Sequence, residues 1–181
     1  MASREGPELI GLAQRTLRDL RLRVAGASGG GPDALREAGY AGASSLFAAF
    51  EQWLEERGSS HVEDLPIDDF SQRAGEFFQN AGWGRVAFRS LHDALAVIDI
   101  ENCWEAELHG EGERGCHITT GTLSGFISCI AHYPVGVMEI ACSAGEPSLC
   151  RFLAGNGEML EHAYERISRG GAWETIGSGE L

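Results

Sequence analysis

The first half of the chain carries apolar residues at the spacing of a helix face. Glycines and a proline within residues 25–33 separate a first helix from a second, because glycine is costly inside a helix and proline suits its first turn. Gly58 ends the second helix, and a third begins near residues 67–69, where two aspartates complement the helix dipole. The predicted apolar faces are Leu9, Ile10, Leu12, Ala13, Leu17 and Leu20 in the first helix, Leu46, Phe47, Phe50, Trp53 and Leu54 in the second, and Phe70, Ala74, Phe77 and Phe78 in the third.

After residue 82 the pattern changes to short runs rich in Val, Ile, Ala and Phe, which are typical of strands. Two pairs of such runs are separated by a helix that Pro134 ends. Neighbouring pairs favour antiparallel hairpins over a doubly wound parallel sheet. We therefore expect an α/β (α+β) fold in which an antiparallel sheet of about four strands packs with helices. The expected strands cover 85–90, 94–100, 135–142 and 149–153, with turns at 90–93 and 143–147, a polar loop at 109–115, and helices at 117–132 and 157–168.

The chain shows no internal repeat and no linker long enough to divide it, so we expect one domain over residues 1–181. Its helical N-terminal part covers residues 6–80, and the helix at 157–168 closes the fold. Gly121 and Gly125 lie four residues apart, on one face of their helix, where small residues let another backbone come close. The second helix has a dense apolar surface. The sequence favours equally its burial in a homodimer interface and its burial in the monomer core.

Composition and charge narrow the class of protein. Of the 181 residues 43% are apolar, which is typical of a globular chain, and the formal net charge of −13 argues against binding nucleic acid or anionic lipid. No segment is apolar over the roughly 20 residues that a membrane span needs, and residues 1–14 lack the apolar core of a secretory leader. We expect a cytoplasmic protein without membrane insertion, whose five cysteines are thiols or metal ligands.

Three of those cysteines and a glutamate predict one metal site. Cys116, Glu139, Cys142 and Cys150 fall within 35 residues, and thiolates with a carboxylate suit a closed, structural zinc site. A hairpin would bring Cys142 and Cys150 together, whereas Glu139 needs a bulge or the strand end to face them, because positions i and i+3 of a regular strand point to opposite faces. Cys116 precedes a helix, whose first amides favour a thiolate.

Spacing alone leaves alternatives open. Free cysteine is often a small core residue, and the chain has no pair of cysteines two residues apart that would mark a zinc site by itself. His117 is adjacent to Cys116 and competes as a ligand, and Cys103 and His109 compete more weakly.

The stretch from Cys116 to Phe152 resembles the signature of the 4-vinyl-reductase domain family, and two upstream blocks, Gly82-Trp83-Gly84 and Cys103-Trp104-Glu105-Ala106, are similar to further family blocks. The resemblance covers about residues 80–155. It implies a fold shared with small subunits of the TRAPP trafficking complex, a homodimer, a zinc held by three Cys and one Glu, and a pocket for small apolar or aromatic molecules near that zinc. The matching positions are Cys116, Gly121, Gly125, Glu139, Cys142, Gly145, Cys150 and Phe152.

We therefore expect a stand-alone sensor or carrier of a small aromatic or hydrocarbon molecule, with structural zinc on Cys116, Glu139, Cys142 and Cys150. The best candidates for the pocket are Trp104, Phe126 and Trp83, because they lie in or beside the family blocks. For any one of them the core is the commoner location of an aromatic side chain.

No catalytic residue is assigned. The chain has no Walker-type phosphate loop, no GxGxxG after a strand and no GxSxG elbow, and zinc with four protein ligands has neither redox chemistry nor an open position. Two alternatives stay open: an enzyme or accessory protein of vinyl reduction in tetrapyrrole and bacteriochlorophyll synthesis, and a protein-interaction module like the trafficking subunits.

Overall fold

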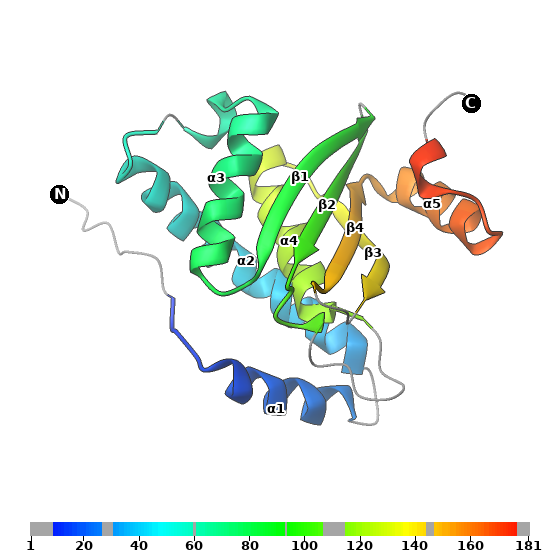
Figure 1. Cartoon of the computed structure of the whole chain (residues 1–181), viewed down its shortest axis with the longest axis horizontal. Helices are drawn as coiled ribbons and strands as arrows, with labels where there is room; N and C mark the ends of the chain where they lie inside the picture. The colour runs from blue at the N-terminus through cyan, green and yellow to red at the C-terminus, as the bar shows by residue number, and fades with distance from the viewer. Residues whose placement is uncertain are drawn as a thin grey trace.

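The computed structural model describes residues 9–26, 31–59, 61–92, 94–106, 115–143 and 147–176 of the chain. Its elements are α1 (Gln14–Ala25), α2 (Gly31–Glu55), α3 (Ile67–Asn80), β1 (Arg85–His92), β2 (Leu95–Glu101), α4 (His117–Ala131), β3 (Gly136–Ser143), β4 (Leu149–Gly155) and α5 (Gly157–Ser168), with short 3-10 turns at Val62–Asp64 and Trp173–Thr175. The four strands form one sheet in the order β1-β2-β4-β3, and every neighbouring pair is antiparallel (Figure 1). The predicted α+β architecture is confirmed.

Helices cover both faces of this sheet. Ile98 on β2 and Phe152 on β4 belong to the large core that α2, α3 and α4 complete. The residues one position along, Val97 and Leu153, belong to a smaller cluster with Ala163 of α5. Because successive strand residues point to opposite faces, α5 must lie on the face away from α2 and α4.

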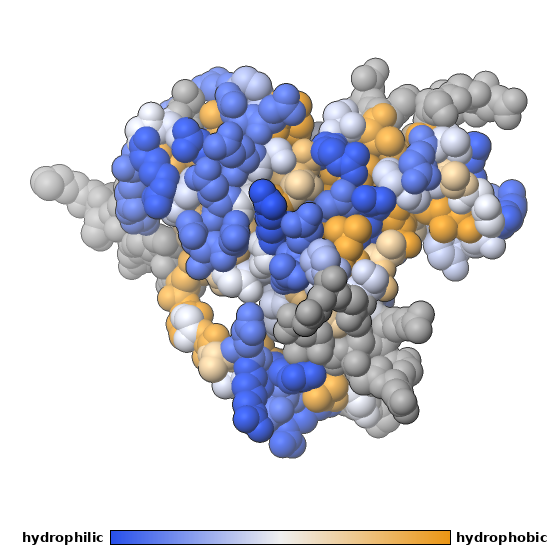
Figure 2. All heavy atoms as spheres, viewed as in Figure 1, coloured by the Kyte–Doolittle hydropathy of each residue, from blue (hydrophilic) through white to orange (hydrophobic). Residues whose placement is uncertain are grey.

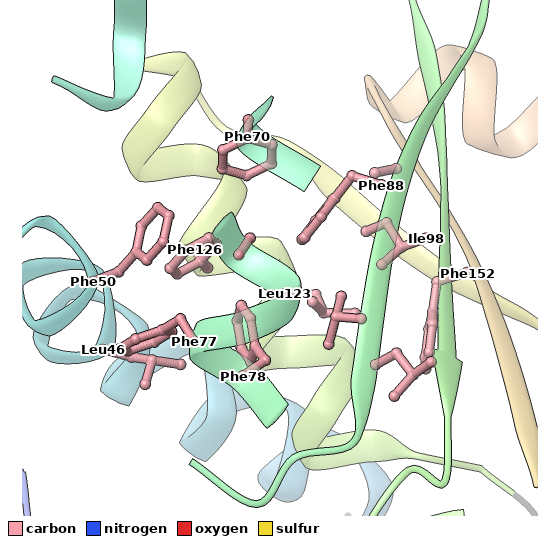
Figure 3. Packing of buried hydrophobic residues seen from close by; sticks show 14 of the residues in the cluster. Leu46, Phe50, Phe70, Phe77, Phe78, Phe88, Ile98, Leu123, Phe126 and Phe152 are labelled. Carbon is pink, nitrogen blue, oxygen red and sulfur yellow. The ribbon is translucent and has the colours of Figure 1, made fainter. Parts of the chain in front are cut away.

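The large core is rich in aromatic rings. Phe50 from α2, Phe70 and Phe78 from α3, and Phe126 from α4 converge between the helices and the sheet, as Figure 3 shows. Neighbouring ring centroids lie 4.9 to 6.2 Å apart, mostly in tilted or edge-to-face pairs, the geometry that the ring quadrupole favours. The predicted apolar stripe of the second helix therefore lies largely in the monomer core, with Leu46, Phe50 and Leu54 buried.

The contact between α2 and α4 depends on glycine. A Cβ added at Gly121 would overlap the backbone oxygen of Arg36, and one added at Gly125 would lie 2.5 Å from the Cβ of Ala43. This confirms that the glycine face of the helix admits another backbone. The partner, Gly39 of α2, was not predicted; a Cβ there would overlap the backbone oxygen of Ile118.

Two predicted boundaries were wrong. The first helix begins at Gln14, so the apolar residues 9–13 precede it rather than form its first turns. A turn was expected at 90–93, but β1 continues through His92, because His92 pairs with Leu95 of β2 after an irregularity in the register that follows Ser90. The loop predicted at 109–115 and the turn at 143–147 fall largely outside the described residues.

Among the described residues, no helix is both long enough and apolar enough to cross a bilayer.

We expect Gly121→Ala to destabilise the fold by about 1–3 kcal/mol or more, because the added methyl group forces two backbones apart. Gly42→Ala on the same helix pair is the matched control, since no atom of the described residues lies within 4 Å of its added Cβ, and alanine should stabilise the helix by up to about 1 kcal/mol. Urea unfolding measures both. Equal stabilities for the two variants would contradict the close contact.

Candidate metal centre

The sheet places two thiols side by side. Cys142 on β3 pairs directly with Cys150 on β4, and their Sγ atoms lie 3.4 Å apart. The register between β3 and β4 shifts between Glu139 and Ala141, which is the irregularity that the i, i+3 spacing of Glu139 and Cys142 required. The shift turns the Glu139 carboxylate toward the same group as the thiols.

The third thiol comes from the start of α4. Cys116 is the residue before this helix, and its Sγ lies 3.5 Å from Cys150 Sγ and 3.9 Å from Cys142 Sγ. One donor atom from each of Cys116, Glu139, Cys142 and Cys150 lies within 4.8 Å of the others. Tetrahedral zinc with Zn–S bonds of about 2.3 Å would separate its sulfurs by about 3.8 Å, so the arrangement is close to that of a metal centre.

The two oxygens of Glu139 have different environments. Oε2 accepts a hydrogen bond of 2.8 Å from the backbone N–H of Cys116, which orients the carboxylate. Oε1 is buried and has no hydrogen-bond partner among the described residues. A buried carboxylate oxygen without a donor is costly, and a cation at the centre of the group would satisfy it.

The electrostatics of this group also favour a cation. Burial raises the pKa of Glu139 to about 7, and the Cys142 sulfur adds to the rise. Contact with Cys103 and the other sulfurs, together with burial, raises the pKa of the Cys116 thiol. Anionic donors packed this closely repel one another, which favours their protonated forms. A divalent cation would attract the thiolates and the carboxylate and so favour their deprotonated forms.

A fourth thiol lies next to the group. Cys103 is fully buried, and its Sγ lies 3.9 Å from both Cys116 Sγ and Thr119 Oγ1. Hydrogen bonds with the neighbouring sulfurs of Cys116 and Cys150 lower the pKa of the Cys103 thiol to about 3. Among the described residues, the group of mutually close donors contains neither Cys103 nor His117. His109 is outside the described part of the chain.

A buried ion pair that no sequence pattern predicted supports the start of α4. Arg21 of α1 and Glu105 are 1% and 0% exposed, with Nε and Oε1 3.0 Å apart. The Glu105 carboxylate also accepts the backbone N–H groups of Ile118 and Thr119 at 3.1 and 2.8 Å, and Arg21 Nη2 donates to the Gly115 carbonyl at 2.8 Å. Because no spacing rule links residues 21 and 105, only the fold could reveal this pair.

The three residues predicted for a ligand pocket are connected through the core. Trp83 and Trp104 meet edge to face with centroids 5.8 Å apart, and Phe78 lies 6.0 Å from Trp83 and 5.2 Å from Phe126. We call Trp104, Trp83, Phe78 and Phe126 the aromatic run. The Trp104 indole Nε1 is buried without a hydrogen-bond partner among the described residues.

A cavity of about 350 Å³ adjoins the metal centre instead. It is lined by Arg36, Gly115, His117, Thr120, Val137, Met138 and Glu139. A second hollow, of about 270 Å³, lies where α2 ends, near Leu54 and Val62. The residues of the aromatic run line neither of these two cavities. That the aromatic run forms a ligand pocket therefore stays a prediction.

No protein-family model matches the chain, and no curated protein sequence matches it. Solved structures do match. The phenol-responsive sensory domain of the transcription activator PoxR, solved with phenol, has 13% identity, a TM-score of 0.63, and coverage of 88% of this chain and 82% of its own. A vinyl-4-reductase family protein from Methanocaldococcus jannaschii has 15% identity, a TM-score of 0.52, and coverage of 81% and 83%. The chain therefore shares the fold of these two proteins, which is the fold that the resemblance in sequence predicted.

In metal-free protein, we expect Glu139 to make stability fall as pH rises. Its pKa of about 7 in the folded chain exceeds the ordinary 4.5, so the folded state holds this proton more tightly. The resulting stabilisation is present below about pH 4.5 and is lost as pH rises through about 7. Urea unfolding with a chelator should therefore show wild type losing on the order of 2 kcal/mol relative to Glu139→Gln between these pH values. Parallel pH profiles for the two proteins would contradict the raised pKa.

Proposed function

We propose that this chain is a zinc-containing domain that senses or carries a small apolar or aromatic molecule. The observation that carries the proposal is the convergence of three thiols and one carboxylate from three separate elements, with sulfur separations of 3.4 to 3.9 Å and a buried carboxylate oxygen that has no hydrogen-bond partner among the described residues. The fold shared with a phenol-responsive sensory domain supports the ligand-binding half of the proposal.

The proposed zinc ligands are Cys116, Glu139, Cys142 and Cys150. A divalent ion with four protein ligands has no open position for substrate, so its contribution is structural. It would tie the β3–β4 hairpin to the start of α4, and binding would couple to folding because the donors come from distant parts of the chain. Five free cysteines also suit a reducing compartment, which supports the cytoplasmic location proposed for the chain.

The aromatic run is the proposed location of the ligand. Its rings offer apolar contact, and the Trp104 indole N–H is a buried donor that has no acceptor within the described part of the chain, which costs about 1–3 kcal/mol. A hydroxyl or carbonyl oxygen on the ligand would accept this hydrogen bond and so fix the ligand's orientation. In the described structure the rings contact one another, so binding requires Trp83 or Trp104 to shift.

We also propose a homodimer formed through the N-terminal segment. Leu9, Ile10 and Leu12 are 51%, 86% and 52% exposed, and Leu20 and Leu22 on α1 are 51% and 41% exposed. Figure 2 shows an apolar strip where this segment leads into α1. Exposed apolar surface of this kind is typical of an interface.

Metal analysis of purified protein should find one zinc per chain. Cys142→Ser should lose most of this zinc and unfold at a lower temperature, because the site loses a thiolate and folding depends on the ion. Cys129→Ser is the matched control, since Cys129 lies on α4 outside the four-donor group. Zinc-free folded wild type, or equal zinc in the two variants, would overturn the metal proposal.

Phenol is the probe for the aromatic run, and tryptophan fluorescence is the measurement. Trp104→Phe keeps a ring but removes the N–H donor, so we expect phenol affinity to fall roughly tenfold. Trp173→Phe, at a C-terminal turn where Arg151 covers the ring, should leave affinity unchanged. If phenol does not bind to wild type, or binds equally to both variants, the assignment to Trp104 fails.

For the dimer, sedimentation velocity should show wild type as a dimer and the double variant Ile10→Glu, Leu12→Glu as a monomer. Ile67→Glu places a charge on an apolar residue that is 48% exposed elsewhere, on α3, and should remain dimeric. Monomeric wild type would rule out this interface.

A further inference from the structure

The cavity at the C-terminal end of α2 shares no lining residue with the metal centre or the aromatic run. Its volume is about 270 Å³, and Leu54 and Val62, which are 2% and 5% exposed and belong to the large core, provide an apolar floor. Cavities that bind small molecules are roughly 300–1,000 Å³, so this one suits only a compact ligand. The other residues that line it are Glu51, Glu55, Ser59 and His61.

The turn that ends α2 places a serine in an apolar position. The Gly58 N–H donates to the Glu55 carbonyl and the Ser59 N–H to the Leu54 carbonyl, each at 3.0 Å, and Gly58 has a φ of 67°. This is the Schellman motif, in which the residue at the position of Ser59 is frequently apolar and packs near the residue at the position of Leu54. The Ser59 Oγ is instead buried without a hydrogen-bond partner among the described residues. An unpaired buried hydroxyl is costly, and a ligand that hydrogen-bonds to it would remove that cost.

The cavity also contains a carboxylate that is not neutralised within the described part of the chain. Glu51 is half-buried, and among the described residues its carboxylate has neither a hydrogen bond nor an ion pair. Its charge reaches the Cys129 thiol of α4, whose pKa is raised by burial and raised further by Glu51. The chain contains no lysine, so an ammonium group beside Glu51 would have to come from a ligand.

The end of α2 adds to the preference for a cation. A helix C-terminus carries a partial negative charge and is stabilised by a nearby cation, but α2 has no basic residue in its last turn. Arg57, just beyond the helix, lies over the Trp53 ring at 4.0 Å and donates to the Trp53 carbonyl at 3.3 Å, and it does not line the cavity. Residues 51–64 contain five acids and this one arginine, so the local charge attracts a cation.

We propose that this cavity binds a small organic ammonium ion, with the charged nitrogen beside the Glu51 carboxylate and the Ser59 hydroxyl and a compact apolar body on Leu54 and Val62. A primary ammonium group donates three hydrogen bonds and accepts none, and the carboxylate and the hydroxyl both accept. Glu55 adds a second acid to the lining. The site is independent of the proposed zinc and of the aromatic run, because it uses no residue of either.

Cyclohexylamine is the probe, cyclohexanol is its neutral analogue, and ligand-observed NMR titration of the whole chain as purified is the measurement. Alkylamines are protonated at neutral pH, as the lysine side chain is. The amine should bind at least about tenfold more tightly than the alcohol, because a hydrogen bond between charged groups is stronger than one between neutral groups.

Glu51→Gln should remove this preference, whereas Glu56→Gln should keep it. Glu56 is the matched control because it lies just after α2, is exposed and does not line the cavity. Circular dichroism checks that both variants fold. Ser59→Ala gives a second readout: amine affinity should fall several-fold while stability in urea is unchanged or higher, because the variant loses an unpaired buried hydroxyl.

Four outcomes would overturn the proposal: no binding of the amine, equal affinity for the amine and the alcohol, an unchanged preference in Glu51→Gln, or a lost preference in Glu56→Gln. The last result would mean that the negative charge of the whole segment attracts the amine without a specific site. Trp104→Phe should leave amine affinity unchanged, so failure of the aromatic run and failure of this cavity are separate results.

Discussion

The close approach of α2 and α4 is the constraint on which the site depends. Their backbones touch because Gly39 and Gly121 have no Cβ, and the contact places the Arg36 carbonyl directly against Gly121. Cys116 lies just over one turn before Gly121, at the start of the same helix. The packing that seats α4 therefore also positions a thiol at the metal centre and brings Arg36 to the cavity beside it.

Charged side chains from three parts of the chain, Arg21, Glu105 and Glu139, meet at the start of α4. Cys116 makes no side-chain cap, and the first amides of the helix are satisfied instead by Glu105 and Glu139. Burying two carboxylates costs free energy unless positive charge offsets it. Arg21 supplies that charge for Glu105. A metal ion would supply positive charge beside Glu139. The proposed zinc would therefore stabilise one of the two carboxylates that bind the start of α4, as Arg21 stabilises the other.

Three consecutive residues link the separate environments of the molecule. The Cys103 thiol contacts the sulfur group, the Trp104 ring joins the aromatic run, and the Glu105 carboxylate holds the start of α4. Residues 103–105 therefore contact the thiol group, the aromatic run and the ion pair to α1 in turn.

The sequence by itself determined the order of elements and the antiparallel hairpins, and it singled out four residues whose donor atoms the fold brings within 4.8 Å of one another. Periodicity and turn residues are local signals, and the i, i+3 conflict between Glu139 and Cys142 correctly required a bulge because strand geometry is local too. Tertiary structure alone decided that Arg21 pairs with Glu105, that Gly39 faces Gly121, and that Arg36 lines a cavity with Glu139. These contacts join residues far apart in the chain, and only the packing of complete elements brings such residues together.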